Sequence, residues 1–215
     1  MGFSKSIVLL ILASFLLSTD AHLSASGPSA NSPPSPIQFR QPRPVCKKLF
    51  LPQLDLPFTL PKIINPALQS ICGVTENPEK CLALVSPCIT GSTTSFSALE
   101  GVVISLIEHV QAALSFALKL SLNKSIKAEV ATALHLCIEL YGKVVEDLKT
   151  ALLALKAHDK VTLKTKLTAA ITTIGRCDEA FQQQGLTNNW PLKKINSVLT
   201  LLAGFGLDIH GKLNL

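Results

Sequence analysis

The sequence has few aromatic residues and few charges for its length. One Trp and one Tyr occur among 215 residues, and charged side chains make up 16% of the chain. The scarcity of aromatics argues against nucleic-acid binding, because single strands are held on aromatic side chains that stack the bases. Beyond the first residues, no stretch reaches the roughly 18 unbroken apolar residues that a membrane helix needs. We therefore expect neither a nucleic acid nor a membrane among the partners.

Catalytic and metal-binding motifs are lacking as well. The chain has no Gly-x-Ser-x-Gly, Cys-x-x-Cys or His-Glu-x-x-His pattern. No close pair of carboxylates on one helix face suggests a general acid and base. The histidines are scattered without a second ligand at metal spacing, and those at 109 and 135 are predicted to lie on the polar sides of their helices: His22, His109, His135, His158 and His210. We expect no catalytic site, no metal and no other cofactor.

The first 21 residues have the features of a secretory signal peptide. A basic Lys5 precedes the apolar run 7–17, and small residues follow it. The predicted cut lies after Ala21, with Ala25 as the alternative. This leader predicts a secreted, extracellular protein.

The next segment, residues 22–64, is predicted to be an irregular, proline-rich extension. Nine of the 13 prolines lie between residues 27 and 61. Each proline fixes φ and removes a backbone donor, so this segment is not expected to form regular helix. Residues 65–211 then form the predicted domain.

Helical periodicity extends over most of the predicted domain. Apolar residues recur in steps of three and four over 96–120, 130–155 and 163–181. A shorter helix is predicted to begin near Trp190-Pro191 after an Asn188 or Asn189 cap, and to stop at Gly204 and Gly206. Residues 65–87 look like two short helices broken at 75–78. Short connections predict an all-α fold, an up-down-up-down antiparallel four-helix bundle with an N-terminal helical hairpin.

Six cysteines in a secreted chain imply a disulfide framework. Cys137 and Cys177 lie at equal distances from the turn near Ala157 and on the inward stripes, so they should face each other. Two buried free thiols are the alternative. Cys72 and Cys81 bracket the break at 75–78, where a bridge is natural.

The cysteines at 46 and 88 remain. Elimination makes Cys46 and Cys88 candidates to pair with each other, but nothing in the sequence fixes the distance between them.

Three motifs resemble the plant invertase and pectin methylesterase inhibitor domain. Residues 71–82, Ile-Cys-Gly-Val-Thr-Glu-Asn-Pro-Glu-Lys-Cys-Leu, resemble its Cys-x-x-Thr-x-x-Pro-x-x-Cys opening. Residues 134–141 resemble its Leu-x-x-Cys-x-x-x-Tyr helix. Residues 167–170 and 177–181 resemble its Ser-Ala-Ala and Cys-x-x-x-Phe segment, with Thr168 in place of the usual serine. The extension that carries Cys46 is not part of the usual domain.

The resemblance implies a four-helix bundle with the Cys72–Cys81 and Cys137–Cys177 bridges that binds and inhibits a cell-wall carbohydrate enzyme. The resemblance also implies that invertase inhibitors of the family often carry Pro-Lys-Phe between the second and third bundle helices. The corresponding loop, residues 156–161, lacks the proline and the phenylalanine. We therefore expect pectin methylesterase as the target, with acid invertase as the alternative. A helical lipid or small-ligand carrier is the alternative from another class.

The resemblance implies that a pectin methylesterase inhibitor covers the substrate cleft of the enzyme with the outer faces of its bundle helices. Periodicity alone, with no family motif, places the following residues on those faces: His135, Glu139, Lys143, Glu146, Lys160, Lys164, Thr168 and Thr172. Tyr141 is expected in the core, with its hydroxyl group hydrogen-bonded.

Two further features bear on the surface of the protein. The sequon Asn123-Lys124-Ser125 predicts glycosylation of Asn123 in an exposed loop. The net charge of +6, which loss of the leader leaves unchanged, suits weak association with acidic pectin, although solubility alone would also explain it.

Overall fold

The computed structural model describes Cys46 and residues 65–89, 91–187 and 190–213. All of these residues belong to one compact unit, residues 42–215. The predicted leader, both predicted cleavage sites and the extension apart from Cys46 lie outside the described residues.

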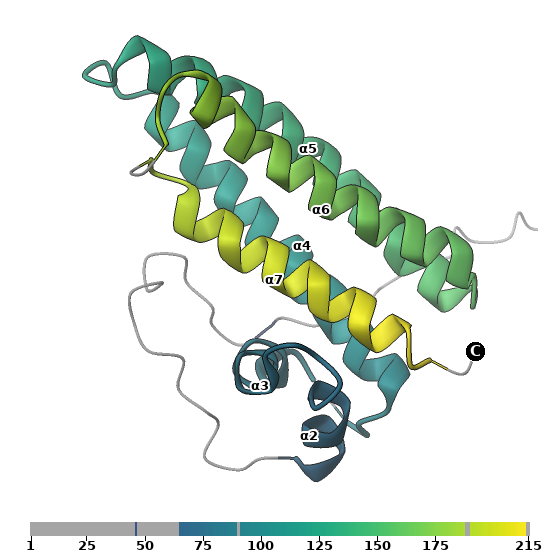
Figure 1. The fold of residues 1–215 in the computed structure, drawn as a ribbon. Coiled ribbons are helices and arrows are strands. Elements are labelled where there is room, and N and C mark those ends of the chain that lie inside the picture. Colours follow the sequence, from purple (N-terminus) through teal and green to yellow (C-terminus); the bar gives the residue numbers. More distant parts are fainter. Residues whose placement is uncertain (1–45, 47–64, 90, 188–189, 214–215) are drawn as a thin grey trace, which may run out of the picture. The chain divides into compact units, whose positions relative to one another are not determined.

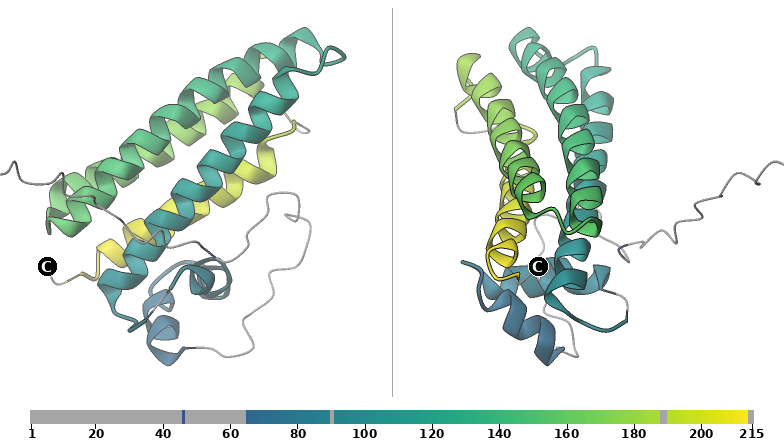
Figure 2. Two further views of the ribbon diagram at one scale, coloured as in Figure 1. Left: turned by 180° about the vertical axis from the view of Figure 1, so that it is seen from behind. Right: turned by 90° about the vertical axis from the view of Figure 1, so that its right-hand side faces the viewer.

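Four long helices form an antiparallel bundle (Figures 1 and 2). They are α4 (Ser95–Ser121), α5 (Ala128–Lys156), α6 (Lys160–Gln183) and α7 (Lys193–His210). Each helix packs against two others, in the closed order α4, α5, α6, α7 and back to α4, and the contact between α5 and α6 is the most extensive. The described residues contain no strand, so the all-α bundle predicted from the sequence is confirmed.

The bundle core consists of the apolar stripes that the sequence predicts. Fully buried side chains come from every long helix, among them Leu99, Leu106, Leu134, Leu148, Leu163, Leu167 and Phe205. Their spacing of three and four keeps each set on one side of its helix, as helices packed at small angles require.

Helix α4 is apolar enough to resemble a membrane span by length and composition. Its best 18-residue window has a mean hydropathy of 1.6, and 50% of that window is buried inside the protein. Helix α4 has this composition because α5, α7 and the short helices that precede it cover it on more than one side.

The fourth bundle helix is shifted along the chain from its predicted position. It begins at Lys193, not at Trp190, and it passes through Gly204 and Gly206 to end at His210. The predicted caps at 188 and 189 lie outside the described residues. Trp190 is buried and stacks on Phe181, with ring centroids 4.4 Å apart. The prediction failed because a glycine near a helix end can mark a stop or a close contact.

Gly206 marks a close contact. A Cβ atom built on it would lie 3.3 Å from both terminal methyl groups of Leu167 on α6 and 3.6 Å from the side chain of Val102 on α4. The absent side chain lets α7 approach two neighbouring helices. At Gly204, one half-turn away, an added Cβ atom would meet nothing within 4 Å.

A short helical hairpin precedes the bundle, as predicted. It consists of α2 (Pro66–Cys72), α3 (Pro78–Val85) and the one-turn η3 (Ser86–Cys88). Asn65 caps α2 by accepting hydrogen bonds from two backbone N–H groups. The hairpin packs on α4 and α7, and Gly101 of α4 lies directly against Ile89 and Cys88.

Three disulfide bonds join these parts. Cys137 on α5 pairs with Cys177 on α6, and Cys72 pairs with Cys81 across the hairpin. Cys46 pairs with Cys88, which settles the pairing that the sequence leaves open. The third bond attaches the chain ahead of the domain to the end of the hairpin.

A polar chain of the buried Tyr141 and Asn196 and the half-buried Asp178 links three bundle helices beside the Cys137–Cys177 bond. The hydroxyl group of Tyr141 on α5 donates to the side-chain oxygen of Asn196 on α7, and the Asn196 amide donates to Asp178 on α6. Burial and then the nearby Asp178 raise the pKa of Tyr141, so the hydroxyl group keeps its proton and acts as a donor. The prediction that Tyr141 is a core residue with a hydrogen-bonded hydroxyl group is confirmed.

The Cys137–Cys177 bond should contribute strongly to stability. The double change Cys137→Ser with Cys177→Ser is expected to cost about 2 to 5 kcal/mol in the free energy of unfolding, because it releases a long loop in the unfolded chain. Thermal unfolding followed by circular dichroism measures the loss. Equal melting temperatures for the variant and the wild type, or native Cys137 that reacts with an alkylating reagent, would contradict the assigned bond.

The two glycines of α7 should respond differently to alanine. Gly204→Ala is expected to raise the free energy of unfolding by up to about 1 kcal/mol, since alanine favours the helix and its methyl group meets nothing. Gly206→Ala should gain clearly less, or lose stability, because its methyl group presses on Leu167. Urea unfolding of both variants measures the difference, and equal gains would show that Gly206 is not a close contact.

Candidate functional site

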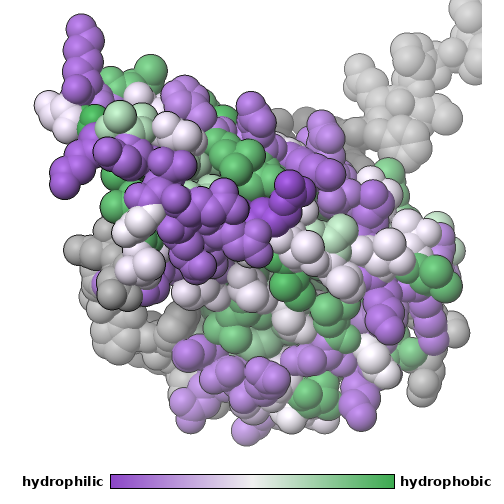
Figure 3. Space-filling model, turned by 45° about the horizontal axis from the view of Figure 1, so that its top comes forward, coloured by the Kyte–Doolittle hydropathy of each residue, from purple (hydrophilic) through white to green (hydrophobic). Residues whose placement is uncertain are grey.

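The predicted contact residues on α5 are all on its outer side. His135, Glu139, Lys143 and Glu146 are exposed, while the core residues between them are buried. On α6, Lys164, Thr168 and Thr172 are exposed as well. The outer faces of α5 and α6 are called the α5–α6 face below. Figure 3, which brings the top of Figure 1 forward, shows mainly hydrophilic side chains with smaller hydrophobic patches among them.

Lys160 does not belong to this exposed set. It is half-buried, and its Nζ donates to the backbone oxygen of Leu213 at 2.8 Å. His210 Nε2 lies 3.1 Å from the backbone oxygen of Lys160 and donates to it. Lys160 therefore fastens the end of α7 to the start of α6. Periodicity could not reveal this, because the contact joins residues 53 positions apart.

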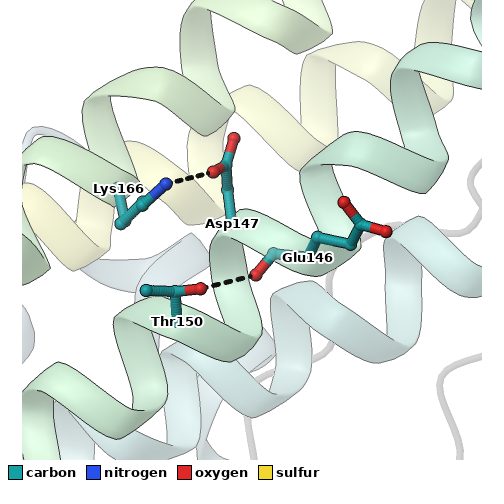
Figure 4. Close-up of polar contacts among 4 residues, drawn as sticks. All are labelled: Glu146, Asp147, Thr150 and Lys166. Carbon is teal, nitrogen blue, oxygen red and sulfur yellow. Dashed lines mark hydrogen bonds and ion pairs between the residues drawn. The ribbon is translucent and has the colours of Figure 1, made fainter.

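An ion pair lies at the seam between α5 and α6. Lys166 Nζ is 2.7 Å from Asp147 Oδ1 (Figure 4), and the Asp147 side chain is only 10% exposed. Figure 4 also shows the carboxylate of Glu146 turned away from this pair, while Thr150 donates to the backbone oxygen of Glu146. The pair fixes the register of the two helices directly beneath the α5–α6 face.

Sequence reasoning missed Asp147, although a signal for it exists. Leu140, Asp147 and Ala154 recur every seven residues, and all three are buried. They lie beside the main apolar stripe, on the side of α5 that meets α6. A carboxylate at such a position is buried only when a cation reaches it. The cation that reaches Asp147 from the facing helix α6 is Lys166.

The prediction that His109 lies on the polar side of its helix is wrong, because His109 is buried. The same prediction for His135 is correct, since His135 is exposed. The Nδ1 atom of His109 donates to the backbone oxygen of Ser105 at 2.6 Å, and burial lowers the pKa of His109. Helix α4 has a second buried side because the hairpin and α7 also cover it, at Gly101 and Val102. The prediction failed because it assumed one buried stripe.

The described residues offer two places where a partner could bind, a pocket at the hairpin and the α5–α6 face. Among the described residues, no group of three or more His, Cys, Asp or Glu side chains is placed to hold a metal ion. A pocket of about 430 Å³ lies at the hairpin, lined by Asn65, Leu68, Leu82, Ser86, Pro87, Ile89 and Gly91. The α5–α6 face instead presents separated lysine, glutamate, histidine and threonine side chains on rigid helices, an arrangement suited to contact with another protein.

The buried His109 predicts a pH dependence of stability. Its pKa in the folded state is below the unfolded value of about 6.5, so the unfolded chain binds more protons once the pH falls below that value. The contribution of His109 to stability should therefore fall as the pH drops from about 7 to 5. His109→Asn, which keeps a donor for Ser105 but does not titrate, should lose less stability over this range.

Urea unfolding at both pH values measures this difference. The pKa values of Glu108 and Asp178 are raised, chiefly by burial, so these groups favour the folded state as the pH falls. Both remain in the variant, and their contributions cancel in the comparison. An equal loss in the two proteins would show that His109 does not determine the pH dependence.

Comparison with known proteins identifies the family. The family model described as plant invertase/pectin methylesterase inhibitor matches residues 66–208, which include α2 to α6 and most of α7. Two solved structures have the same fold. A mutant form of a pectin methylesterase inhibitor from Arabidopsis has 18% identity and a TM-score of 0.58, with 68% of this chain and 96% of that chain covered.

The second structure is a pectin methylesterase inhibitor from Arabidopsis thaliana. It has 17% identity and a TM-score of 0.52, with 71% of this chain and 99% of that chain covered. Comparison with curated protein sequences gives no significant match. The family match extends over more than half of the sequence, and the chain therefore belongs to the plant invertase/pectin methylesterase inhibitor family.

Proposed function

We propose that this protein is a secreted inhibitor that binds pectin methylesterase in the plant cell wall and covers its substrate cleft with the α5–α6 face. The family match over residues 66–208 is the observation that carries the proposal. The family is one of inhibitors, and the match includes both helices that supply the proposed surface.

The rigidity of the α5–α6 pair supports this assignment. The Cys137–Cys177 bond and the Asp147–Lys166 ion pair join the two helices at two levels. A surface fixed before binding loses little conformational entropy when the complex forms. The exposed side chains above these links can therefore present a defined pattern of charge to the enzyme.

The turn between α5 and α6 favours pectin methylesterase over acid invertase. It has neither the proline nor the phenylalanine that the resemblance associates with invertase inhibition. The exposed apolar side chains at the helix ends that flank it are Leu153 and Val161, which are smaller than phenylalanine. The ring of His158 in this turn contacts the ring of Phe96 on α4, with ring centroids 5.6 Å apart. The turn thus lacks a free aromatic anchor of the kind that dominates interface energies.

Inhibition of acid invertase is the second candidate, because the family includes invertase inhibitors. A lipid or small-ligand carrier is a third, and the pocket at the hairpin is the observation that bears on it. A dye-displacement assay with fatty acids tests the carrier function separately. Weak association with acidic pectin, suggested by the net charge of +6, would keep the inhibitor near its target.

An inhibition assay distinguishes the two enzymes. Purified protein is expected to inhibit a plant pectin methylesterase at acidic pH and to leave a plant acid invertase active. Inhibition of invertase alone would reverse the assignment. If neither enzyme is inhibited, the proposed function is wrong, whereas the family membership stands.

A charge reversal tests the proposed surface. Lys143→Glu should weaken inhibition about 5-fold, which corresponds to about 1 kcal/mol for one charge at the rim of an interface. Lys119→Glu makes the same change at an exposed site on α4 and serves as the control, with little expected effect. Equal inhibition constants for the two variants would argue against contact through the outer face of α5.

A further inference from the structure

The connection between α4 and α5 contains the one Asn-x-Ser/Thr pattern of the sequence, Asn123-Lys124-Ser125. Asn123 and Ser125 are both exposed. The backbone N–H of Asn123 donates to Leu120 at 3.0 Å, and the Asn123 side-chain oxygen accepts from the backbone N–H of Ser125 at 3.0 Å. The amide nitrogen of Asn123 is thus presented on an ordered, accessible turn.

Two leucines beside this turn are exposed to an unusual degree. Leu122 directly precedes the sequon and is 81% exposed, and Leu118, one helical turn earlier, is 45% exposed. Residues four apart on a helix lie on one side, so the two leucines form a small apolar surface at the end of α4. Exposure of such an apolar surface to water costs free energy, and a group that covers the surface removes this cost.

We propose that Asn123 carries an N-linked glycan whose first sugars lie over Leu118 and Leu122. The inference rests on the proposed secretion, because the sugar donor is met in the secretory compartment. The three disulfide bonds agree with passage through that oxidising compartment.

The chemistry is a group transfer from a lipid-linked oligosaccharide pyrophosphate. The Asn123 amide nitrogen forms a bond to the anomeric carbon of the first N-acetylglucosamine and loses one proton. The bond between that carbon and the pyrophosphate oxygen breaks, and the lipid pyrophosphate leaves. The carbon–hydrogen faces of the attached sugars can then pack on the leucine side chains.

The glycan and the α5–α6 turn lie at opposite ends of α5. Helix α5 has 29 residues and is about 43 Å long, with Asn123 near its start and the α5–α6 turn at its end. A glycan on Asn123 therefore leaves Lys143 and Lys164 accessible to an enzyme, and it crowds the approach to the first turns of α5.

Intact-mass measurement tests the modification. The chain is secreted from plant cells behind the leader of a host protein, so that the result does not depend on the chain's own leader. The wild type and the matched control Ser125→Thr should carry a glycan that peptide-N-glycosidase A removes, whereas Ser125→Ala and Asn123→Gln should have the mass of the bare chain. A secreted wild type with the mass of the bare chain would overturn the proposal, whatever the protein inhibits.

Dye binding tests the covering of the two leucines. The fluorescence of anilinonaphthalene sulfonate should be low with the glycosylated protein, rise after enzymatic removal of the glycan, and fall again in deglycosylated Leu122→Ser. Fluorescence that does not change when the glycan is removed would show that the sugars do not cover this surface. A dimer of the deglycosylated and of the glycosylated protein, dissociated by Leu122→Ser, would show instead that a second copy covers it.

Discussion

The contact between α5 and α6 is the constraint on which the rest of the bundle depends. It is the most extensive contact between helices in the described chain, and it is fixed by a covalent bond and by an ion pair. The disulfide at Cys137 and Cys177 sets the register at one level, and Asp147 with Lys166 sets it at another. Because the two links agree in register, the helices cannot slide past each other without losing both.

The other helices are positioned from this pair. The side chain of Tyr141 extends from α5 beside the disulfide and donates a hydrogen bond to Asn196 of α7. Asn196 in turn donates to Asp178 of α6. Gly206 lets α7 lie close to both α6 and α4. This polar chain and the missing side chain help to position the fourth helix, together with the contacts of Lys160 at its end. The outer faces of α5 and α6 are exposed. The links between the helices lie on their inner sides, so they hold the bundle rigid and leave the outer side chains of α5 and α6 exposed.

Sequence patterns predicted the elements whose signals are local. Helices α4, α5 and α6 follow from uninterrupted apolar stripes, and the equal distances of Cys137 and Cys177 from the α5–α6 turn predict that these cysteines face each other. The breaks at Thr75 and Pro78 separate α2 from α3. Each helix is determined by residues within a few turns of one another, and the Cys137–Cys177 pairing requires only the position of the one turn between two helices, so spacing alone is informative.

The failed predictions involve contacts between distant segments. His109 is buried because the hairpin and α7 add a second packing surface to α4, and Lys160 is engaged because the chain end returns to it. Gly204 and Gly206 look like a helix stop in the sequence, but α7 continues through both. At Gly206 the small residue allows the close approach of Leu167, a contact that the local sequence does not show. Apart from Lys160, the exposed positions of the candidate site follow from periodicity. The proposed target enzyme depends on one loop, residues 156–161.

Lysine footprinting on the complex tests the central claim most directly. Free inhibitor and inhibitor saturated with pectin methylesterase are acetylated briefly, and the modification of each lysine is measured by mass spectrometry. The account predicts that Lys143 and Lys164 become protected in the complex while Lys119 on α4 stays reactive. Unchanged reactivity of Lys143 and Lys164 in a complex that inhibits the enzyme would contradict binding through the α5–α6 face.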